Sequence, residues 1–551
     1  MLMWLSLAKR RFWPIARFLV LACLCCLMVV SCGGTNNNTK SPSANSSGAG
    51  ADRLIVASVE QPRTLDPADG YEVAISDIIT SLGDRLYTYK EDTEEIIPQL
   101  ATALPKISED GLTYTMPLRQ GVVFHDGEVF NAKAMAFSLE RFVKNGGKPS
   151  TLLSTVMESV QATGDYELTI KLKATFAPFP SLLAFPGLCA VSPKAYQIGQ
   201  GKFKPNEFIG TGPYKLASFT PNLVKVDAFD KYWGDKPALK GIDFTMLGNS
   251  ANLYNSFTTG AIDVTFRDLE PSQIVSLKQE APIKGFQLLE KSSTGIHYLA
   301  LNRNAKPLDQ LEVRQAIAAI IDRPLIIDRV YKKLADPAYS IVPANFATSV
   351  PVFKAPYGDG NVAKAKELLT KAGFSKAKPF ELEIWYSSNS SEREATAALL
   401  KEYVAQKLEG IMTIKPQVVE STTLFSNVEK GIYPSYLISW FPDFADADNY
   451  LAPFFNCDKG SVEKGCEEGD SKTQGFFYYS EEMLKLIKAE RQEKDPAKRK
   501  QLIAQAQELI AKDVPLVPLW QEKQFVFAQK NIKNVNINPI LGLPLGKMSK
   551  G

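Results

Sequence analysis

Histidine is scarce in this sequence: His125 and His297 are the only two among 551 residues. Imidazole is a common metal ligand and the most frequent general base, so its scarcity argues against a direct nickel site and against a histidine-based enzyme. Neither a Gly-x-Ser-x-Gly nor a His-Glu-x-x-His motif is present. His125, between Phe124 and Asp126, is predicted to be a hydrogen-bonded turn residue. We therefore expect no catalysis, no metal site and no cofactor.

A strong excess of one charge is also missing. The formal net charge is +3, and Lys9, Arg10, Arg11 and Arg17 lie in the first 31 residues, which contain no acid. Without these four positive charges the net charge is −1. Nucleic acids are bound by clustered Lys and Arg, so we expect no nucleic-acid partner. The chain length predicts two to four domains.

The first apolar run is too short to cross a membrane. It covers residues 18–30, fewer than the ~20 residues of a bilayer-spanning helix, and it follows the basic stretch, as in a secretion signal. The sequence Val-Val-Ser-Cys at 29–32 resembles the bacterial lipoprotein box, in which the cysteine is acylated and becomes the new N-terminus. We expect residues 1–31 to be a lipoprotein signal peptide and Cys32 the lipidated residue. Two alternatives remain: twin-arginine export through Arg10-Arg11, and a buried Cys32 on an uncleaved anchor.

Residues 32–51 contain few side chains that could be buried, because they are rich in Asn, Ser, Gly and Thr. Such a segment is a flexible tether that spans roughly 25 Å. An anchored chain would then be exported and held at the outer face of the cytoplasmic membrane.

Beyond the first 32 residues only three cysteines remain. Cys457 and Cys466 stand nine apart in a loop rich in Gly and charged residues, and a disulfide is predicted for an oxidising compartment. A zinc site would need four ligands, and no histidine lies near. Cys189 stands in an apolar setting and is predicted to be a buried thiol.

Short β-rich runs alternate with helical patterns, which favours an α/β fold. Alternation predicts strands at 54–57, 113–130, 166–172, 516–519 and 525–528, and spacing predicts helices at 71–86, 131–141 and 311–321. Asn361 and Asp495-Pro496 are predicted helix starts, and Gly373 is a predicted helix end.

Several motifs in a fixed order carry a family resemblance. They are PQLA at 98–101, DGLTYT at 110–115, LRQGVVFHDG at 118–127, FNA at 130–132, FSLER at 137–141, TLDP at 64–67, GTGPY at 210–214, YWG at 232–234, GAID at 260–263, VRQAI at 313–317 and DVP at 513–515. The series closely resembles family 5 extracellular solute-binding proteins, the dipeptide- and oligopeptide-binding components of ABC importers. It extends from about residue 55 to residue 528. Most of its glycines, Gly210 and Gly212 included, are interpreted as turn residues with positive φ.

The resemblance implies a two-lobed periplasmic-binding-protein fold of the cluster C type, with a hinge and a central cleft. Lobe I would comprise residues 52–87, 205–294 and 520–551. Residues 88–204 would form an extra subdomain of lobe I, and residues 295–519 would form lobe II.

The same resemblance indicates a ligand site in the segment WFPDFADADNY at 440–450. In the peptide-binding members, a Trp-x-x-Asp segment presents a carboxylate to the α-ammonium group of the ligand, and Trp440 and Asp443 match it. Phe441 lies between them and is a further candidate. The alternative for Asp443 is a solvated acidic loop. Asp446 and Asp448 could support the site, solvate the loop or bind calcium.

A ligand carboxylate would need an arginine, and Arg393 is the nearest match to the arginine that some relatives use. Its local sequence, SSERE at 390–394, departs from the family pattern. Trp385 and Tyr386 follow a predicted strand, and they could line the pocket or pack in the core.

The resemblance therefore implies a monomeric binding protein, not an enzyme, that captures short peptides and delivers them to ABC permease subunits. The alternatives are the same fold with another cargo (nickel, haem or an oligosaccharide) and a ligand sensor.

Overall fold

The computed structural model describes residues 52–72, 75–91 and 93–551. The predicted signal peptide, Cys32 and the predicted tether to residue 51 lie outside the described residues. Within the described part of the chain, no helix is both long enough and apolar enough to cross a bilayer.

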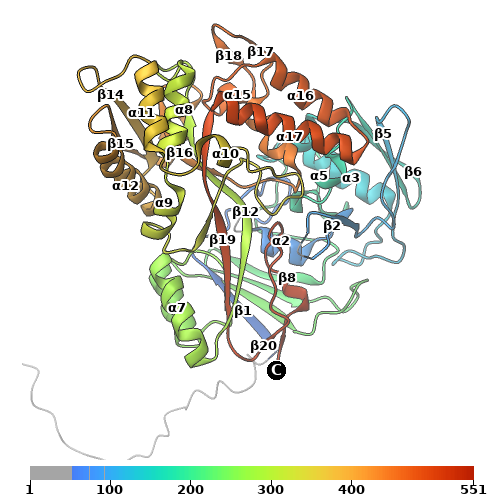
Figure 1. Ribbon diagram of the computed structural model, residues 1–551. Coiled ribbons are helices and arrows are strands. Elements are labelled where there is room, and N and C mark those ends of the chain that lie inside the picture. Colours follow the sequence, from blue (N-terminus) through green and yellow to red (C-terminus); the bar gives the residue numbers. More distant parts are fainter. Residues whose placement is uncertain (1–51, 73–74, 92) are drawn as a thin grey trace, which may run out of the picture. The chain divides into compact units, whose positions relative to one another are not determined.

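Two long antiparallel strands, β12 (Gln287–Leu301) and β19 (Leu516–Ala528), form the centre of the largest sheet. Figure 1 shows them running side by side through the middle of the described residues. The sequence predicted two short strands at 516–519 and 525–528, but the structure has one continuous strand. Pro518 does not end it, because the ladder shifts its register at Tyr298, opposite Pro518, where the proline has no N–H to donate.

Beyond β19 the sheet continues into the residues predicted for lobe I. The strands are β11 (Val264–Thr265), β1 (Arg53–Ser58), β10 (Gly241–Met246), β9 (Leu223–Ala228) and β8 (Tyr214–Thr220), in that order. The helices are α2 (Ser76–Leu82), α6 (Ser250–Thr258) and α7 (Pro271–Lys284). The helix predicted at residues 71–86 therefore covers only Ser76–Leu82 in the structure.

Beyond β12 the order is β16 (Ser435–Trp440), β14 (Phe380–Ser387) and β15 (Met412–Val419), which continue the sheet into the residues predicted for lobe II. Strands β14 and β15 are parallel and are joined through α12 (Ser391–Lys407), so this is a βαβ unit. The other long helices are α8 (Leu311–Ile320), α11 (Val362–Lys371), α16 (Glu481–Gln492) and α17 (Pro496–Asp513).

Residues 88–204 contain a separate four-stranded sheet. Its order is β4 (Lys106–Ile107), β5 (Thr113–Pro117), β7 (Glu167–Leu172) and β6 (Met157–Gly164), and α3 (Ala132–Lys144) packs on it. Its buried side chains belong to the same apolar cluster as those of lobe II, whereas β1, β10 and α2 belong to another. Assignment of this subdomain to lobe I stays a prediction.

The remaining elements are short. They are β2 (Tyr87–Tyr89), β3 (Ile96–Pro98), β13 (Ala335–Pro337), β17 (Lys459–Ser461), β18 (Gly465–Glu468), β20 (Ile532–Lys533), β21 (Ser549–Lys550), α4 (Thr151–Ser154), α5 (Phe179–Leu182), α9 (Arg323–Arg329), α10 (Lys354–Tyr357), α13 (Ser421–Val428), α14 (Ala452–Phe455) and α15 (Asp470–Thr473).

The β12 ladder is interrupted between Ser292 and Ile296, close to the predicted boundary between the lobes. The side chain of Gln521 compensates there: its Nε2 donates to the Ser293 carbonyl at 2.6 Å, and its Oε1 accepts from the backbone N–H of Ala344 at 3.0 Å. A buried strand can therefore change direction without leaving these polar groups unpaired.

Local signals placed the helix ends correctly. Asn131, Asn361 and Asp495 each accept a hydrogen bond from a backbone N–H of the first helical turn. Gly373 has a φ of +86°, as expected at a helix end.

Gly210 and Gly212 correct one expectation, because neither has the positive φ that was predicted. They are needed for close approach instead. A Cβ on Gly210 would lie 2.5 Å from the Leu82 carbonyl oxygen, and one on Gly212 would lie 2.4 Å from the Leu82 carbonyl carbon. His125 is hydrogen-bonded to the same turn, as predicted. Its Nε2 lies 3.1 Å from the Gly212 carbonyl oxygen, and its Nδ1 accepts from the Gly210 N–H. Burial lowers its pKa to about 4.

A buried ion pair joins the predicted motifs TLDP and FSLER. Arg141 donates to both carboxylate oxygens of Asp66, at 2.9 and 2.5 Å, and both side chains are almost fully buried. We predict that Arg141→Met lowers the free energy of unfolding by about 3–5 kcal/mol, because it leaves the Asp66 charge buried and uncompensated. Urea unfolding followed by circular dichroism measures the change. Arg63→Met, which breaks the more exposed pair with Asp69, should cost less than about 1 kcal/mol. Equal losses in the two variants would contradict the prediction.

Candidate functional site

A cavity of about 820 Å³ is lined by residues of both lobes and of the strand β19 that joins them. Lobe I contributes the end of β1, the start of α2 and residues 266–271. Predicted lobe II contributes residues 440–443, at the end of β16 and just after it, and Asn389, Ser391 and Glu392, at the start of α12. Strand β19 contributes residues 522–525. Loops that follow strands hold many of these side chains, which is where α/β sheets commonly bind ligands.

Asp443 lies in the wall of this cavity. The hydroxyl of Tyr71 donates to Asp443 Oδ1 at 2.6 Å, and the backbone N–H of Asp443 donates to Asn449 Oδ1 at 2.9 Å. Burial raises the pKa of the Asp443 carboxyl from 3.8 to about 6, although side-chain hydrogen bonds from Tyr71 and Asn449 to the carboxyl oppose the shift. The carboxyl forms no ion pair with any described residue. It is therefore a partly buried acid without a counter-ion, and not a solvated loop residue.

Trp440 and Phe441 line the same cavity. The Trp440 ring packs edge-on against Phe454 with centroids 5.0 Å apart, and its buried Nε1 has no hydrogen-bond partner among the described residues. Phe441 is 41% exposed. Its ring covers Gly295, where a Cβ would lie 2.4 Å from a ring carbon. An indole donor and an exposed phenyl ring thus flank the acid.

Asp446 and Asp448 have a different role, because both form ion pairs in the protein. Arg499 of α17 binds both oxygens of Asp446, at 2.6 and 2.8 Å. Arg491 of α16 binds both oxygens of Asp448, at 2.6 and 2.9 Å. Neither aspartate lines the cavity. These pairs hold the loop that carries Asp443 against the two helices.

The other three predicted ligand residues lie away from the described cavity lining. Arg393 donates to Ser439 Oγ at 2.9 Å, its Nε has no partner within the described residues, and burial lowers its pKa. Trp385 packs on Tyr433 with ring centroids 4.6 Å apart, and Tyr386 is buried in the core. The structure thus brings together Trp440, Phe441 and Asp443. Arg393, Trp385 and Tyr386 are not part of the described lining, although the charge of Arg393 acts on the lining residues Tyr331 and Glu522.

Sequence reasoning missed the cavity residues Tyr71 and Tyr331. Tyr71 lies 372 positions before Asp443. Tyr331 is buried and packs on Trp520 with centroids 4.6 Å apart. No local pattern marked either residue, since only the tertiary fold brings it to the site.

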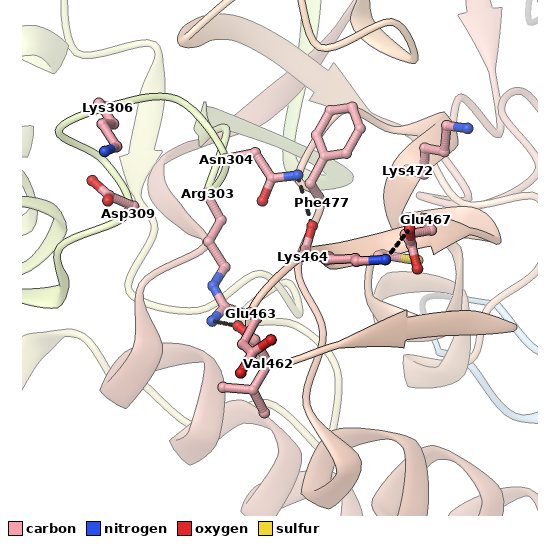
Figure 2. A pocket seen from close by; sticks show the side chains of 11 residues that line it. Arg303, Asn304, Lys306, Asp309, Val462, Glu463, Lys464, Glu467, Lys472 and Phe477 are labelled. Carbon is pink, nitrogen blue, oxygen red and sulfur yellow. Dashed lines mark hydrogen bonds and ion pairs between the residues drawn. The ribbon is translucent and has the colours of Figure 1, made fainter.

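A second cavity of about 780 Å³ lies beside the hairpin of β17 and β18 (Figure 2). Cys457 and Cys466 are joined in this hairpin by a disulfide with Cα atoms 5.7 Å apart. The lining includes Arg303, which donates to the Val462 carbonyl, and Lys464, which pairs with Glu467. Its basic and acidic groups are mixed, and it holds none of the predicted ligand residues. The cavity at Asp443 is therefore the candidate site. Cys189 is a buried free thiol, as predicted.

Known proteins share this architecture. The family described as bacterial extracellular solute-binding proteins, family 5 (middle part), matches residues 95–462. A glutathione-binding protein, GsiB, of Escherichia coli O6:K15:H31 (strain 536 / UPEC) is 28% identical over 503 residues, which are 89% of this chain and 93% of GsiB. HbpA2 of Haemophilus parasuis superposes with a TM-score of 0.76 at 24% identity, covering 91% of this chain and 100% of HbpA2. A dipeptide-binding protein of Pseudoalteromonas sp. SM9913, solved with Met-Leu, gives a TM-score of 0.72 at 23% identity and covers 90% and 100%.

Two lobes, a pair of connecting strands and a cavity between them define a binding protein of the two-lobed periplasmic type. The chain belongs to family 5 of the bacterial extracellular solute-binding proteins. That family serves solute transport, which is the class that the ordered motifs predicted.

The raised pKa of Asp443 predicts a pH dependence. In the empty protein the carboxyl has a pKa of about 6, and a cationic ligand group would need it ionised. Affinity for such a ligand should fall by up to about tenfold per pH unit below pH 6, as the carboxylate is protonated. Isothermal titration between pH 4.5 and 7.5 measures this. In Asp443→Asn the slope should become clearly shallower, and an unchanged slope would contradict the assignment.

The empty protein should respond in the opposite direction. The pKa of Asp443 is higher in the folded protein than the 3.8 expected for an unfolded chain, so the folded state binds more protons between about pH 4 and 6. The contribution of Asp443 therefore becomes more favourable as the pH falls through that window. The difference in the free energy of unfolding between the wild type and Asp443→Asn, followed over this pH range, measures the contribution of Asp443.

Proposed function

We propose that this protein captures short peptides in the cavity between its lobes and delivers them to the permease of an ABC importer. The observation that carries the proposal is Asp443, a partly buried carboxylate that lines the cavity and has no counter-ion among the described residues. A peptide supplies the missing charge through its N-terminal ammonium. Such a charge-assisted hydrogen bond is about twice as strong as a neutral one.

Tyr71 has a defined part in this mechanism. In the empty site its hydroxyl satisfies one oxygen of Asp443, and it comes from lobe I whereas Asp443 comes from lobe II. An incoming ammonium joins or replaces this hydroxyl at the carboxylate. Contacts of the ligand with both lobes favour the closed state over the open one, which is an ordinary population shift. The break in β12 at residues 292–296 is the proposed hinge.

Neighbouring groups suit a peptide backbone. The unpaired Nε1 of Trp440 can donate to a peptide carbonyl, and Phe441 offers an apolar wall that accepts different side chains. Reversible binding requires no covalent step, so we propose no enzymatic activity. Arg393, with its unpaired Nε, remains a proposed partner for the ligand carboxylate. Trp385 and Tyr386 remain proposals as ligand contacts.

The relatives support the peptide cargo. GsiB is named for glutathione, a tripeptide, and the Pseudoalteromonas protein was solved with a dipeptide. We propose that the chain works as a monomer, is held at the outer face of the cytoplasmic membrane through lipidated Cys32, and contacts the permease when closed.

Thermal shift against peptide pairs tests the amine anchor. Dipeptides with a free N-terminus should raise the melting temperature, and their N-acetylated forms should not, because acetylation removes the charge that Asp443 binds. Asp443→Asn keeps the shape of the site but should lower the affinity for free dipeptides at least about 30-fold, from the ~2 kcal/mol lower bound for losing one member of a buried charge pair. Glu463→Gln, an acid beside the second cavity, is the control and should bind normally. Equal binding of acetylated and free peptides would refute the anchor.

The anchor has its own test. Cys32→Ser should move the protein from the membrane fraction to the soluble exported fraction, because one acylation site is lost. Fractionation and metabolic labelling with a fatty-acid analogue measure the change. Cys189→Ser is the control, since that thiol is buried. Persistent labelling of Cys32→Ser would contradict lipidation at this residue.

A further inference from the structure

The charges around the candidate site do not balance. Eight of the described residues that line the cavity are acidic and two, Arg267 and Lys523, are basic. Both bases already have partners: Arg267 lies 3.1 Å from Asp77, and Lys523 lies 2.9 Å from Glu290 and 3.3 Å from Asp336. Neither base of the lining is left for an anionic ligand group; Arg393, the proposed partner of a ligand carboxylate, is not part of the lining and follows Glu392 in the sequence.

Most of the acids in the lining, in contrast, form no ion pair with a basic side chain of the described residues. Glu72 pairs with Arg63, Asp77 with Arg267, and Glu522 with His297. The other five acids of the lining form no ion pair with a described residue; they are Glu60, Asp268, Glu270, Glu392 and Asp443. An empty cavity with this charge attracts cations and disfavours anions.

Two of these acids come from opposite lobes. Glu270 caps the start of α7, and Glu392 lies in the first turn of α12. Burial and the like charge of Glu392 raise the pKa of Glu270. Similarly, burial and the charge of Asp268 raise the pKa of Glu60. Any closure of the lobes increases the repulsion between Glu270 and Glu392 unless a cation lies between them.

Tyr331 is a further polar side chain close to Glu392. It lines the cavity, it is only 8% exposed, and its hydroxyl forms no hydrogen bond with a described residue. Burial raises the pKa of this hydroxyl, and the charges of Glu392 and Glu522 add to the shift, whereas the charge of Arg393 opposes it. A hydroxyl so placed can bind a ligand group that also contacts Glu392.

The acids are not arranged for a bare metal ion. Across the described ranges, no three His, Cys, Asp or Glu side chains come together as metal ligands. The five acids without an ion pair come from separate segments of the lining, at residues 60, 268–270, 392 and 443. A lining of this kind fits an extended organic cation with its charges at separate positions.

We propose that the preferred cargo is a short cationic peptide, whose N-terminal ammonium binds Asp443 and whose Lys or Arg side chain lies between Glu270 and Glu392. This inference rests on the proposed function, because it assumes a peptide in the cavity. It also separates this chain from GsiB by cargo: glutathione carries two carboxylates and one ammonium, and five unpaired acids would repel it.

Titration calorimetry with Ala-Lys, Ala-Leu, Ala-Glu and glutathione tests the proposal. At low salt Ala-Lys should bind at least about tenfold more tightly than Ala-Leu, and Ala-Glu and glutathione should bind more weakly than Ala-Leu. The preference for Ala-Lys should shrink as salt is added, because the acids lie at a partly open cavity. In the double variant Glu270→Gln and Glu392→Gln the preference for Ala-Lys over Ala-Leu should fall to less than about threefold, measured as the ratio of the two affinities in that variant.

Glu72→Gln is the matched control, because it removes an acid from the same lining that already has a partner. It should keep the preference. Melting temperatures of the empty variants show whether each is folded. If Ala-Leu and Ala-Lys bind equally, and Asp443→Asn weakens both, the proposed function stands and the cationic preference is wrong. If none of the four ligands binds the folded wild type, both are wrong.

Discussion

The pairing of β12 with β19 is the constraint on which the rest of the structure depends. Both strands cross the predicted boundary between the lobes, so a single hydrogen-bonded ladder connects the two halves of one sheet. The ladder is interrupted at residues 292–296, the proposed hinge, and the side chain of Gln521 pairs with the Ser293 carbonyl that the ladder leaves unpaired. Because β19 also lines the cavity, any change in the angle between the lobes changes the cavity.

One loop uses the same residue type for two purposes. Asp446 and Asp448 are bound by Arg499 and Arg491, so their charges stabilise the packing of the loop on α16 and α17. Asp443, a few residues earlier, has hydrogen bonds from Tyr71 and Asn449 but no cationic partner among the described residues, and its pKa is raised. The paired acids hold the loop rigidly, and the unpaired acid keeps interaction energy for a ligand. Asp443 therefore contributes less to the stability of the empty protein than a paired acid would, and its charge can interact with a ligand instead.

Local sequence signals predicted much of the fold. The caps at Asn131, Asn361 and Asp495 were correct, because capping depends on a side chain and the next few backbone groups. The predicted break at Pro518 was wrong, since a bulge in the ladder accommodates the proline. The reason given for Gly210 and Gly212 was wrong too, because close approach to Leu82 is a long-range property.

By itself the sequence determined the family, the helix ends and Trp440 and Asp443 as the candidate anchor, because ordered motifs and short-range patterns carry that information. It did not indicate that Tyr71 would meet Asp443, that Arg393 would lie outside the cavity lining, or that Glu270 and Glu392 would approach each other. These relations depend on how the lobes pack, and residues hundreds of positions apart leave no periodic trace in one sequence. Only the tertiary structure decided the charge of the cavity, since charge balance depends on which acids find a partner in space.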